Sequence, residues 1–560
     1  MTGAQTLVAE LERLGVEVIF GLCGDTSLPL YEAFADSTTI RHVLTRDERC
    51  ASFMADAYAR LSGRVGVCEG PSGGGATYIL PGVAEANDSS VPLVCFTSDI
   101  AIGDRGRGTL TELDQQALFT PVTKRAFAPT TSAQLAQVTL EAFREATSGS
   151  LGACHVGLPF DTLSGEAGRT ETTGRDVAGD RYPSARIAPD PDDVRRAADL
   201  LLQSRRPLIV AGAGAVRSGA WDEVAALARA LGAPVATSIC GKGSIAETDP
   251  LALGVIGSNG GLPYRHDIVR TADLVFYVGS GTGSVTTEKW TLPDRQTTIL
   301  QLDTNAAIIG RNYGTAAGLP CDARLGLAAL VDELARRGAG GRGDRIDPDA
   351  IETARLAHME RVRPLFESDE RPIRPERLLS ALFAALPTNA VVIADPGTPC
   401  PYLSAYWRVP RAGRWFASPR AFGALGYALP AVVGASFAKP DAGRIVGMMG
   451  DGSFGISAGE LETLVRLDVP VTLIVCNNAA YGWIKAGQKS RRSRYFSVDF
   501  LQSDHAAIAR AYGMPARRVE DPGELDDAMR EAVASSGPFL LDVVTQPLED
   551  AHAPVSKWIA

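Results

Sequence analysis

Short runs of Val, Ile and Leu recur along almost the whole chain, and amphipathic helical segments separate many of them. The runs are RVGVCEG (64–70), VPLVCFTS (91–98), PLIVAGAG (207–214), DLVFYVGS (273–280), TTILQLD (297–303), AVVIAD (390–395), RIVGMMGDG (444–452) and PVTLIVCNN (470–478). Helical segments include AWDEVAALARALG (220–232) and SAGELETLVRLD (457–468). Strands that alternate with helices in this way predict parallel sheets covered on both faces. The expected fold class is therefore α/β.

The chain has 560 residues, which is too many for one hydrophobic core at roughly 150 residues per domain. Two polar segments, 164–190 and 337–348, are poor in large apolar residues and are typical of linkers. They separate three blocks, for which we expect domains at 1–165, 190–340 and 370–560. Each domain should be a mainly parallel sheet flanked by helices.

Charge and cysteine content exclude several classes of protein. Lys and Arg total 55 against 65 Asp and Glu, a net charge of −10, so nucleic acid is a poor partner. Nine scattered cysteines do not make a disulfide framework, and we expect a reducing, cytoplasmic setting.

The N-terminus has no basic start and does not read as a signal peptide. The uncharged stretch 421–438 contains three glycines and Pro430, which favours a buried segment over a membrane span.

The strongest local signal lies between Asp451 and Asn478. The run RIVGMMG ends in Gly450-Asp451-Gly452-Ser453, and the next run ends in Asn477-Asn478. Parallel strands would bring both motifs to the carboxyl edge of one sheet, where open α/β sheets bind ligands. Asp451 and Asn478 could then offer oxygen ligands to Mg²⁺ or Ca²⁺, and Gly452 would let a phosphate approach the backbone. Either dipeptide alone is a common turn former.

These motifs and their spacing resemble the signature of thiamine-diphosphate (ThDP) enzymes. The resemblance covers the whole chain and is greatest to the acetohydroxyacid (acetolactate) synthase branch. It implies that Asp451, Asn478 and the main-chain carbonyl of Ala480 hold Mg²⁺ on the cofactor's diphosphate. It also implies a pyrimidine-binding domain, a central nucleotide-binding-like domain and a diphosphate-binding domain, in that order. Further cofactor contacts are implied for Gly397, Thr398, Gly423, Leu425, Gly450, Gly452, Ser453 and Tyr481. The alternative for Gly397-Thr398 is a plain turn at the end of a strand, and the alternative for Leu425 is a leucine of the hydrophobic core.

Glu48 opens the helical pattern 45–63. An acidic residue is favoured there by the helix dipole alone, by ~0.3–1 kcal/mol. Its sequence context resembles the family helix whose glutamate hydrogen-bonds the aminopyrimidine of ThDP, and a carboxyl in an apolar pocket has a raised pKa suited to sharing a proton. Because Glu48 and Asp451 lie in different blocks and the family builds each site between two subunits, the resemblance implies a homodimer or homotetramer.

The expected substrate region departs from the synthase pattern. Asp25 stands where the synthases usually have Gly, and pyruvate decarboxylases carry Asp there for proton transfer. Thr111 replaces a Gln, whereas Glu112 and Lys124 match the family, with a solvated surface lysine as the alternative for Lys124. Gly487 replaces a Trp that selects a larger acceptor in biosynthetic synthases. Arg105 and Arg107 precede this stretch, either as a solvated face or as a selector of an anionic substrate.

The central block matches the family's FAD-binding domain only in part. Gly212 and Gly214 are retained, as are Asp303 and Asp322 near the expected adenosine position. The charged flavin contacts after 273–278 are replaced by Gly279-Ser280-Gly281-Thr282. This argues against FAD, although FAD, another nucleotide and an empty site all stay open.

The resemblance implies a ThDP- and Mg²⁺-dependent decarboxylating carboligase, like acetolactate synthase, that adds the enamine of ThDP to a carbonyl acceptor. No histidine falls at a family catalytic position, and few proton donors favour carboligation over aldehyde release. The alternative is a C–C lyase, hydrolase or non-oxidative decarboxylase of a specialised 2-oxo or 2-hydroxyacyl substrate. A non-catalytic cofactor-binding subunit is a third possibility, which Glu48, Asp451 and Asn478 argue against.

Overall fold

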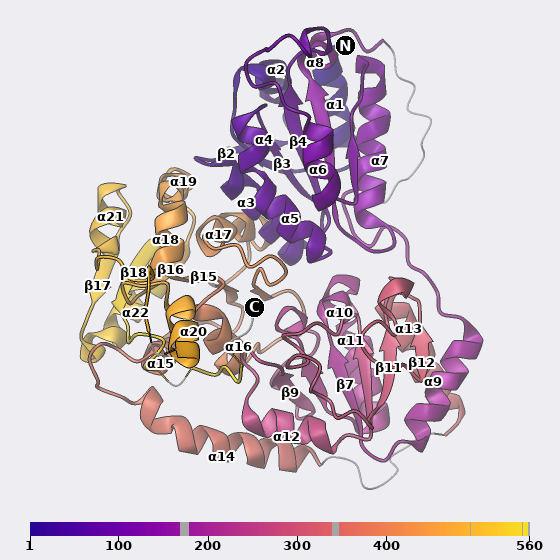
Figure 1. Cartoon of the computed structure of the whole chain (residues 1–560), viewed down its shortest axis with the longest axis vertical. Helices are drawn as coiled ribbons and strands as arrows, with labels where there is room; N and C mark the ends of the chain where they lie inside the picture. The colour runs from indigo at the N-terminus through magenta and orange to yellow at the C-terminus, as the bar shows by residue number, and fades with distance from the viewer. Residues whose placement is uncertain (169–178, 339–346, 493, 552, 558–560) are drawn as a thin grey trace. The chain divides into compact units, whose positions relative to one another are not determined.

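A computed structural model of the chain describes residues 1–168, 179–338, 347–492, 494–551 and 553–557. Over these residues it contains three sheets of six strands, and every strand pair within them is parallel. Helices flank each sheet (Figure 1). This confirms the predicted fold class. Part of each predicted linker, 164–190 and 337–348, lies outside the described residues.

The first sheet has the strand order β2-β1-β3-β4-β6-β5. Its strands are β1 (Val18–Gly21), β2 (Arg41–Leu44), β3 (Gly66–Gly70), β4 (Leu93–Asp99), β5 (Arg125–Phe127) and β6 (Ala153–Pro159). Its helices are α1 (Gly3–Arg13), α2 (Leu28–Asp36), α3 (Glu48–Ser62), α4 (Gly74–Tyr78), α5 (Leu80–Asp88), α6 (Gln115–Phe119), α7 (Leu135–Thr147) and α8 (Phe160–Ser164). Asp47 caps α3 by accepting a hydrogen bond from Arg49 N, and the helix ends at Gly63 with φ +80°.

Three separate chain segments build this first compact unit: residues 1–185, 419–441 and 455–469. The later segments contribute α17 (Ala428–Ala438) and α19 (Leu461–Leu467). Helix α17 crosses α3 at Gly434, where a Cβ would lie only 2.1 Å from the carbonyl oxygen of Met54. The uncharged stretch 421–438 is therefore largely buried against α3, and no helix of the described residues is long and apolar enough to cross a membrane.

The second compact unit holds the other two sheets, and the central one has the order β12-β11-β10-β7-β8-β9. Its strands are β7 (Pro207–Ala211), β8 (Val235–Thr237), β9 (Ala252–Val255), β10 (Leu274–Val278), β11 (Thr298–Leu302) and β12 (Ala317–Leu319). Its helices are α9 (Pro191–Gln203), α10 (Ala213–Ser218), α11 (Trp221–Leu231), α12 (Pro263–Thr271) and α13 (Ala323–Arg336). The central strands are buried along their whole length, as continuous apolar runs predict.

The third sheet has the order β14-β13-β15-β16-β18-β17. Its strands are β13 (Val391–Ala394), β14 (Phe416–Ala417), β15 (Ile445–Gly450), β16 (Val471–Asn477), β17 (Ala516–Val519) and β18 (Phe539–Val544). The helices of this region are α14 (Pro348–Phe366), α15 (Pro375–Ala385), α16 (Pro399–Tyr406), α18 (Asp451–Ser457), α20 (Gly482–Arg492), α21 (His505–Ala511) and α22 (Leu525–Ala534).

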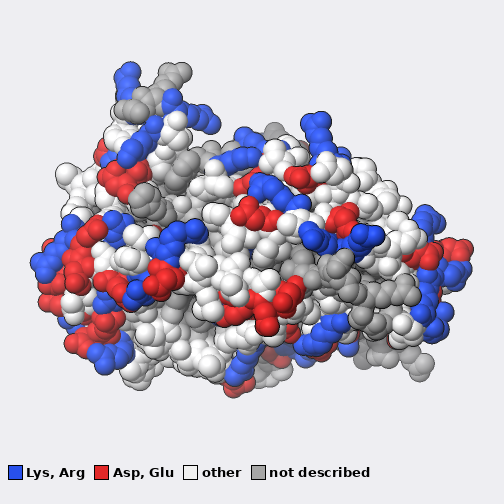
Figure 2. Space-filling view, turned by 90° about the horizontal axis from the view of Figure 1, so that it is seen from below, with Lys and Arg blue, Asp and Glu red and all other residues white. Residues whose placement is uncertain are grey.

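Surface charge and cysteine state agree with the composition. Basic and acidic side chains are interspersed on the face shown in Figure 2. All nine cysteines are free, and seven of them are buried. Buried free cysteines act here as small apolar side chains.

Candidate active site

Three neighbouring strands of the third sheet end in polar residues. Asp395 follows β13, Asp451 follows β15, and Asn478 follows β16. Because β13, β15 and β16 are adjacent and parallel, these residues lie at one edge of the sheet. Ser453 joins two of the strand ends, since its hydroxyl donates to Asp395 Oδ1 at 2.9 Å. The sequence prediction of a shared carboxyl edge thus agrees with the topology.

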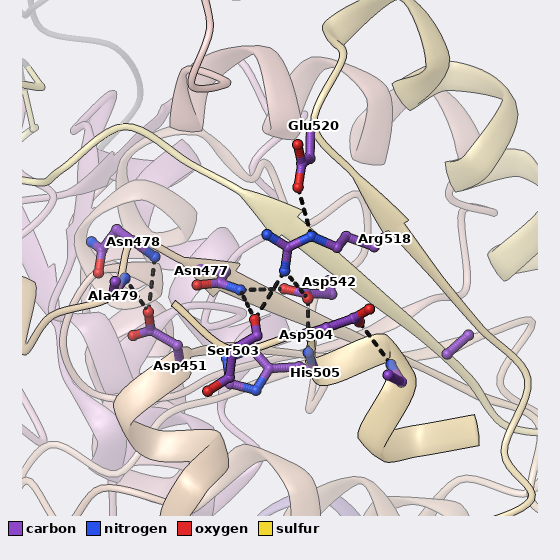
Figure 3. Close-up of polar contacts among 12 residues, drawn as sticks. Asp451, Asn477, Asn478, Ala479, Ser503, Asp504, His505, Arg518, Glu520 and Asp542 are labelled. Carbon is purple, nitrogen blue, oxygen red and sulfur yellow. Dashed lines mark hydrogen bonds and ion pairs between the residues drawn. The ribbon is translucent and has the colours of Figure 1, made fainter. Parts of the chain in front are cut away.

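The Asp451 carboxylate ties the ends of β15 and β16 together (Figure 3). Its Oδ2 accepts hydrogen bonds from Asn478 N at 2.8 Å and Ala479 N at 2.6 Å, and its Oδ1 accepts one from Gly452 N at 2.8 Å. Burial nevertheless raises the pKa of Asp451 to about 6, against the opposing effect of these backbone donors. A cation at this carboxylate would relieve the cost of a buried negative charge.

Asn478 supplies the observation that best tests a metal at this edge. Its side-chain Oδ1 is buried and has no hydrogen-bond partner, which is uncommon for a buried amide oxygen. The nearby Ala480 carbonyl accepts from Gly482 N at 2.8 Å and keeps a second lone pair. One carboxylate, one amide oxygen and one carbonyl form a donor set that suits Mg²⁺. Among the described residues, no group of three or more His, Cys, Asp or Glu could hold a metal.

The cradle around these oxygens depends on small residues. A Cβ at Gly482 would lie 2.9 Å from Asn478 Nδ2 and 3.5 Å from Thr398 Oγ1. A Cβ at Gly452 would lie 2.6 Å from the Tyr481 ring. Gly397 has φ +94° and, like Gly450, has nothing within 4 Å of its Cβ position. Backbone near Gly397 and Gly450 is therefore open to a ligand.

Glu48, in the first unit, begins α3 and is only 8% exposed. Burial raises the pKa of its carboxyl above the ordinary value. A Cβ at Gly75 would lie 3.0 Å from Glu48 Oε1 and 2.5 Å from the Pro71 ring, and a Cβ at Gly24 would lie 2.4 Å from Pro71 Cβ. Glu48, Pro71 and the loop that carries Gly24 therefore lie side by side.

The segment of Gly423 and Leu425 is fastened to the helix that Glu48 opens. Glu85 accepts hydrogen bonds from the backbone N–H of Phe422 at 2.7 Å, and Tyr427 donates to Asp56 Oδ2 at 2.7 Å. Arg60 links the two acids, with ion pairs of 2.6 Å to Asp56 and 3.0 Å to Glu85. Gly423 itself has φ +67° and an open Cβ position.

The predicted substrate residues differ in their exposure and in the hydrogen bonds that they make. Asp25 is exposed in the loop beside Gly24, and Glu112 is exposed, with Oε1 accepting from Gly106 N at 2.5 Å. Thr111 Oγ1 lies 2.7 Å from Ser72 Oγ, over Gly73. Lys124, in contrast, donates to the carbonyls of Glu145 and Ser148 and pairs with the Glu145 carboxylate at 3.4 Å. Its ammonium is thus already engaged by acceptors of α7 and the residue after it.

Family comparisons match part or all of each of the three sheets. Models of the thiamine pyrophosphate enzyme family match residues 1–118 (N-terminal TPP binding domain), 194–330 (central domain) and 395–543 (C-terminal TPP binding domain). A probable acetolactate synthase large subunit of Methanococcus aeolicus is 31% identical, over 98% of this chain and 92% of its own length. This chain is a thiamine pyrophosphate enzyme. It belongs to the acetolactate synthase-like branch, and so it is a ThDP-dependent enzyme of the transferase or lyase kind.

Two other relatives of this ThDP enzyme are named for different reactions. An acetolactate synthase large subunit of Parasynechococcus marenigrum is 30% identical, over 99% of the chain and 89% of the relative. A probable 2-ketoarginine decarboxylase of Pseudomonas aeruginosa is 32% identical, over 97% of the chain and 94% of the relative. Relatives with both types of name thus match nearly the full length.

Sequence reasoning missed a polar network behind Asp451 and Asn478 of the ThDP enzyme (Figure 3). Asn477 Nδ2 donates to Asp542 Oδ1 at 2.9 Å and to the Ser503 carbonyl at 2.8 Å. Asp542 Oδ2 accepts from His505 N and from Arg518 Nη1, both at 2.9 Å. Asp542 is fully buried within β18. The available signal was this single acid in the apolar run FLLDVV, because a buried charge needs partners.

The central sheet gives structural explanations for residues predicted at a flavin site. A Cβ at Gly212 would lie 2.2 Å from Gly279 O, so the glycines let two loops touch. Asp322 caps α13 and accepts from Arg186 and Ser218 at 2.8 Å each, which engages both carboxylate oxygens. Asp303 accepts from Asn305 N at 2.9 Å. None of these contacts requires a flavin.

Proposed function

We propose that this ThDP enzyme uses Mg²⁺ and acts as a 2-oxo acid decarboxylating carboligase. The observation that carries the metal assignment is the buried, unpartnered Asn478 Oδ1 beside the Asp451 carboxylate. Asp451, Asn478 and the Ala480 carbonyl would hold the ion, and open backbone at Gly397 and Gly450 would receive the diphosphate. The family membership supplies the need for that diphosphate site.

Bound ThDP supplies the carbanion chemistry that breaks the bond next to a 2-oxo group. Glu48 would hold a proton at the pyrimidine ring nitrogen N1′, because burial raises the pKa of its carboxyl and so favours the protonated form. Gly423 and Leu425 would bind the other side of the pyrimidine, positioned by the Glu85 and Asp56 contacts.

Carboligation is favoured over simple release of an aldehyde by the relatives' names and by the state of the histidines. In the first unit, His42 is hydrogen-bonded to Tyr31 at 3.1 Å and Glu69 at 3.2 Å, and buried His155 to Thr97. These histidines are therefore poorly placed to protonate the enamine of ThDP, and slow protonation favours its reaction with a carbonyl acceptor. Asp25 and Glu112 are the proposed substrate-side groups.

A decarboxylase of a specialised 2-oxo acid is the second candidate. The 32%-identical probable 2-ketoarginine decarboxylase supports it. So do Asp25, Thr111 and Gly487, where the sequence departs from the synthase pattern. Lys124 is not assigned to the substrate in either scheme, because its ammonium is engaged elsewhere.

We also propose a homodimer or homotetramer, with each active site completed by a second copy. Glu48 and Asp451 belong to different compact units of one chain, and a ThDP molecule must meet both. Light scattering during size-exclusion chromatography would check the assembly. A mixture of Glu48→Gln and Asp451→Asn chains provides the matched test. Sites shared between copies should regain part of the activity on mixing, and a persistently inactive mixture would contradict shared sites.

Mass spectrometry of the products from a panel of 2-oxo acids, with ThDP and Mg²⁺, tests the reaction. A ligated ketol such as acetolactate supports the first candidate, and an aldehyde alone supports the second. Glu48→Gln should abolish exchange of the ThDP C2 proton in D₂O. Retained exchange in that variant would refute the role assigned to Glu48.

A further inference from the structure

A cavity of about 480 Å³ lies in the second unit, lined by residues of the edge strand β9 and of the helices α12 and α14. Helix α14 comes into contact with α12 there (Figure 1). The volume is within the ~300–1,000 Å³ usual for small-molecule sites. Of the described residues that line it, none is assigned to ThDP or Mg²⁺. The cavity is therefore separate from the candidate active site.

Most of the acidic residues in the wall of this cavity already have a partner. Glu247 and Asp249 each pair with a basic residue that is not part of the wall, at 2.7 and 2.8 Å. Glu352 pairs inside the wall with Arg355 at 2.5 Å. Asp349, exposed in the first turn of α14, has no ion pair among the described residues. One lining carboxylate is thus left unpaired.

Arginines of the wall outnumber this free carboxylate. Arg265 and Arg408 also line the cavity, and in the described part of the chain neither forms an ion pair with a carboxylate. Arg265 is only 6% exposed, and its guanidinium donates to the carbonyls of Ala405 at 2.8 Å and Val255 at 3.1 Å. Two guanidinium charges without an acidic partner give the wall a net positive charge, and charges removed from water are stabilised by a counter-ion.

Arg355 and Arg408 have donors to spare for a ligand. Arg408 donates through Nε and Nη2 to the Glu247 carbonyl, at 3.0 and 2.5 Å. Arg355 donates through Nε and Nη2 to the Glu352 carboxylate, at 2.7 and 2.5 Å. The Nη1 groups of both arginines have no hydrogen-bond partner among the described residues. Loss of hydration, and then the nearby charge of Arg355, lower the pKa of Arg408. An anion between the two guanidinium groups would relieve this repulsion and accept from both.

The rest of the wall is apolar and includes Pro250, Leu253 and Ile351. We propose that the cavity binds a small organic phosphomonoester, with its phosphate between Arg355 and Arg408 and its carbon body on the apolar wall. A phosphomonoester carries about 1.5 to 2 negative charges near neutral pH and three acceptor oxygens. It can therefore satisfy two separate guanidinium groups, whereas a carboxylate brings one charge. The assignment does not rest on the proposed function.

Helix α16 connects this cavity with the edge that would receive the diphosphate of ThDP. The helix begins directly after Gly397-Thr398 and ends at Tyr406, shortly before Arg408 in the chain. Arg265 binds the last turn of the helix through the Ala405 carbonyl. The phosphomonoester is therefore an effector that changes the affinity for ThDP, and ThDP changes the affinity for the effector by the same factor.

Calorimetric titration of the full-length protein, saturated with ThDP and Mg²⁺, tests the binding. The probes are phenyl phosphate, benzoate and benzamide, which share an aromatic ring and differ in charge, and bound ThDP keeps them out of the diphosphate site. We expect phenyl phosphate to bind, benzoate to bind at least tenfold more weakly, and benzamide not to bind measurably. No binding of phenyl phosphate at millimolar concentration would overturn the site. Equal binding of benzoate would overturn the choice of phosphate.

Three variants locate the binding. Arg408→Gln and Arg355→Gln should each weaken the binding of phenyl phosphate at least tenfold. Arg411→Gln removes the same charge from a neighbouring exposed arginine that does not line the cavity, and it should leave the affinity unchanged. Arg355→Gln also leaves the contact of Arg408 with the Glu247 carbonyl in place, so a loss of affinity in this variant does not arise from that contact. Unchanged affinity in Arg355→Gln would refute the phosphate position.

The effector role is tested by titrating the protein with ThDP in the presence and absence of phenyl phosphate. We expect the ThDP affinity to change at least twofold in the parent and to stay constant in Arg408→Gln. No change in the parent would overturn the effector role. A change that persists in Arg408→Gln would also overturn it, because it would arise from competition at the diphosphate site.

Discussion

Replacing Gly434 by alanine should push α17 away from α3. The added Cβ would lie 2.1 Å from the Met54 carbonyl oxygen, 2.9 Å from its carbonyl carbon and 3.1 Å from its Cα. Carbon needs about 3.5 Å from such atoms, so the helices must separate by about 1 Å or more. All three obstacles are backbone atoms, and no side chain can turn aside to relieve the overlap.

The energetic cost follows from two opposing contributions. Overpacking of a buried contact costs about 1–3 kcal/mol, and backbone obstacles put this one near the upper end. Alanine gains up to ~1 kcal/mol over glycine in a helix interior. We therefore expect a net loss of about 2 kcal/mol, together with weaker ThDP binding, because α17 follows directly on the segment with Gly423 and Leu425.

Amide hydrogen exchange of α3 and α17 is the appropriate assay, since a chain of three domains does not unfold in two states. Gly487→Ala is the matched control: it also lies within a helix, has nothing within 4 Å of its Cβ position, and should stabilise α20 by ~0.5–1 kcal/mol. Exchange rates and ThDP affinity unchanged in Gly434→Ala would refute the close crossing of the two helices.

Three further predictions concern single side chains. Tyr427→Phe removes the donor to the fully buried Asp56 and should cost about 1.5–3 kcal/mol, measured as a lower thermal midpoint of the holoenzyme; no change would mean that another group satisfies Asp56. Asp542→Asn weakens the hydrogen bond that holds Asn477 and should reduce Mg²⁺ affinity about tenfold in titrations with saturating ThDP. Unchanged affinity would show that the network does not position Asp451 and Asn478. The pKa of Asp451 is raised to about 6 from 3.8, so without metal this group contributes stability below pH 3.8 that is lost as pH rises through 6. Mg²⁺ should therefore raise the thermal midpoint more at pH 7.5 than at pH 5, and Asp451→Asn should lose that difference; equal rises at both pH values in the parent would contradict it.

Much of the fold could be predicted because parallel, buried strands leave a strong record in the sequence. The apolar runs ending at Asp395, Asp451 and Asn478 became β13, β15 and β16, since continuous Val, Ile and Leu suit strands buried on both faces. The two-residue strand β14 and the three-residue strand β5 have no comparable pattern. The union of α17 with the first unit was also unpredictable, because it depends on contacts between residues hundreds of positions apart.

The candidate site could likewise be predicted from the sequence only in part. Asp451 and Asn478 could be found because turn residues at strand ends are conspicuous and their order matches a family. The network behind them could not, since Asp542 reaches Asn477 only through the pairing of β16 with β18, and Arg518 reaches Asp542 from β17.

The divided first unit also affects how the protein must be made. Residues 1–185 leave the ribosome more than two hundred residues before the segment 419–441, which contains α17 and belongs to the same unit. At about 5–20 residues per second, α3, which ends at Ser62, waits roughly 20–75 s until α17 is complete at Ala438, with the surface around Met54 uncovered. During this time the exposed apolar surface favours aggregation, and we expect the nascent chain to bind chaperones. An N-terminal fragment cut at residue 185 would keep that uncovered surface permanently, however complete its sheet.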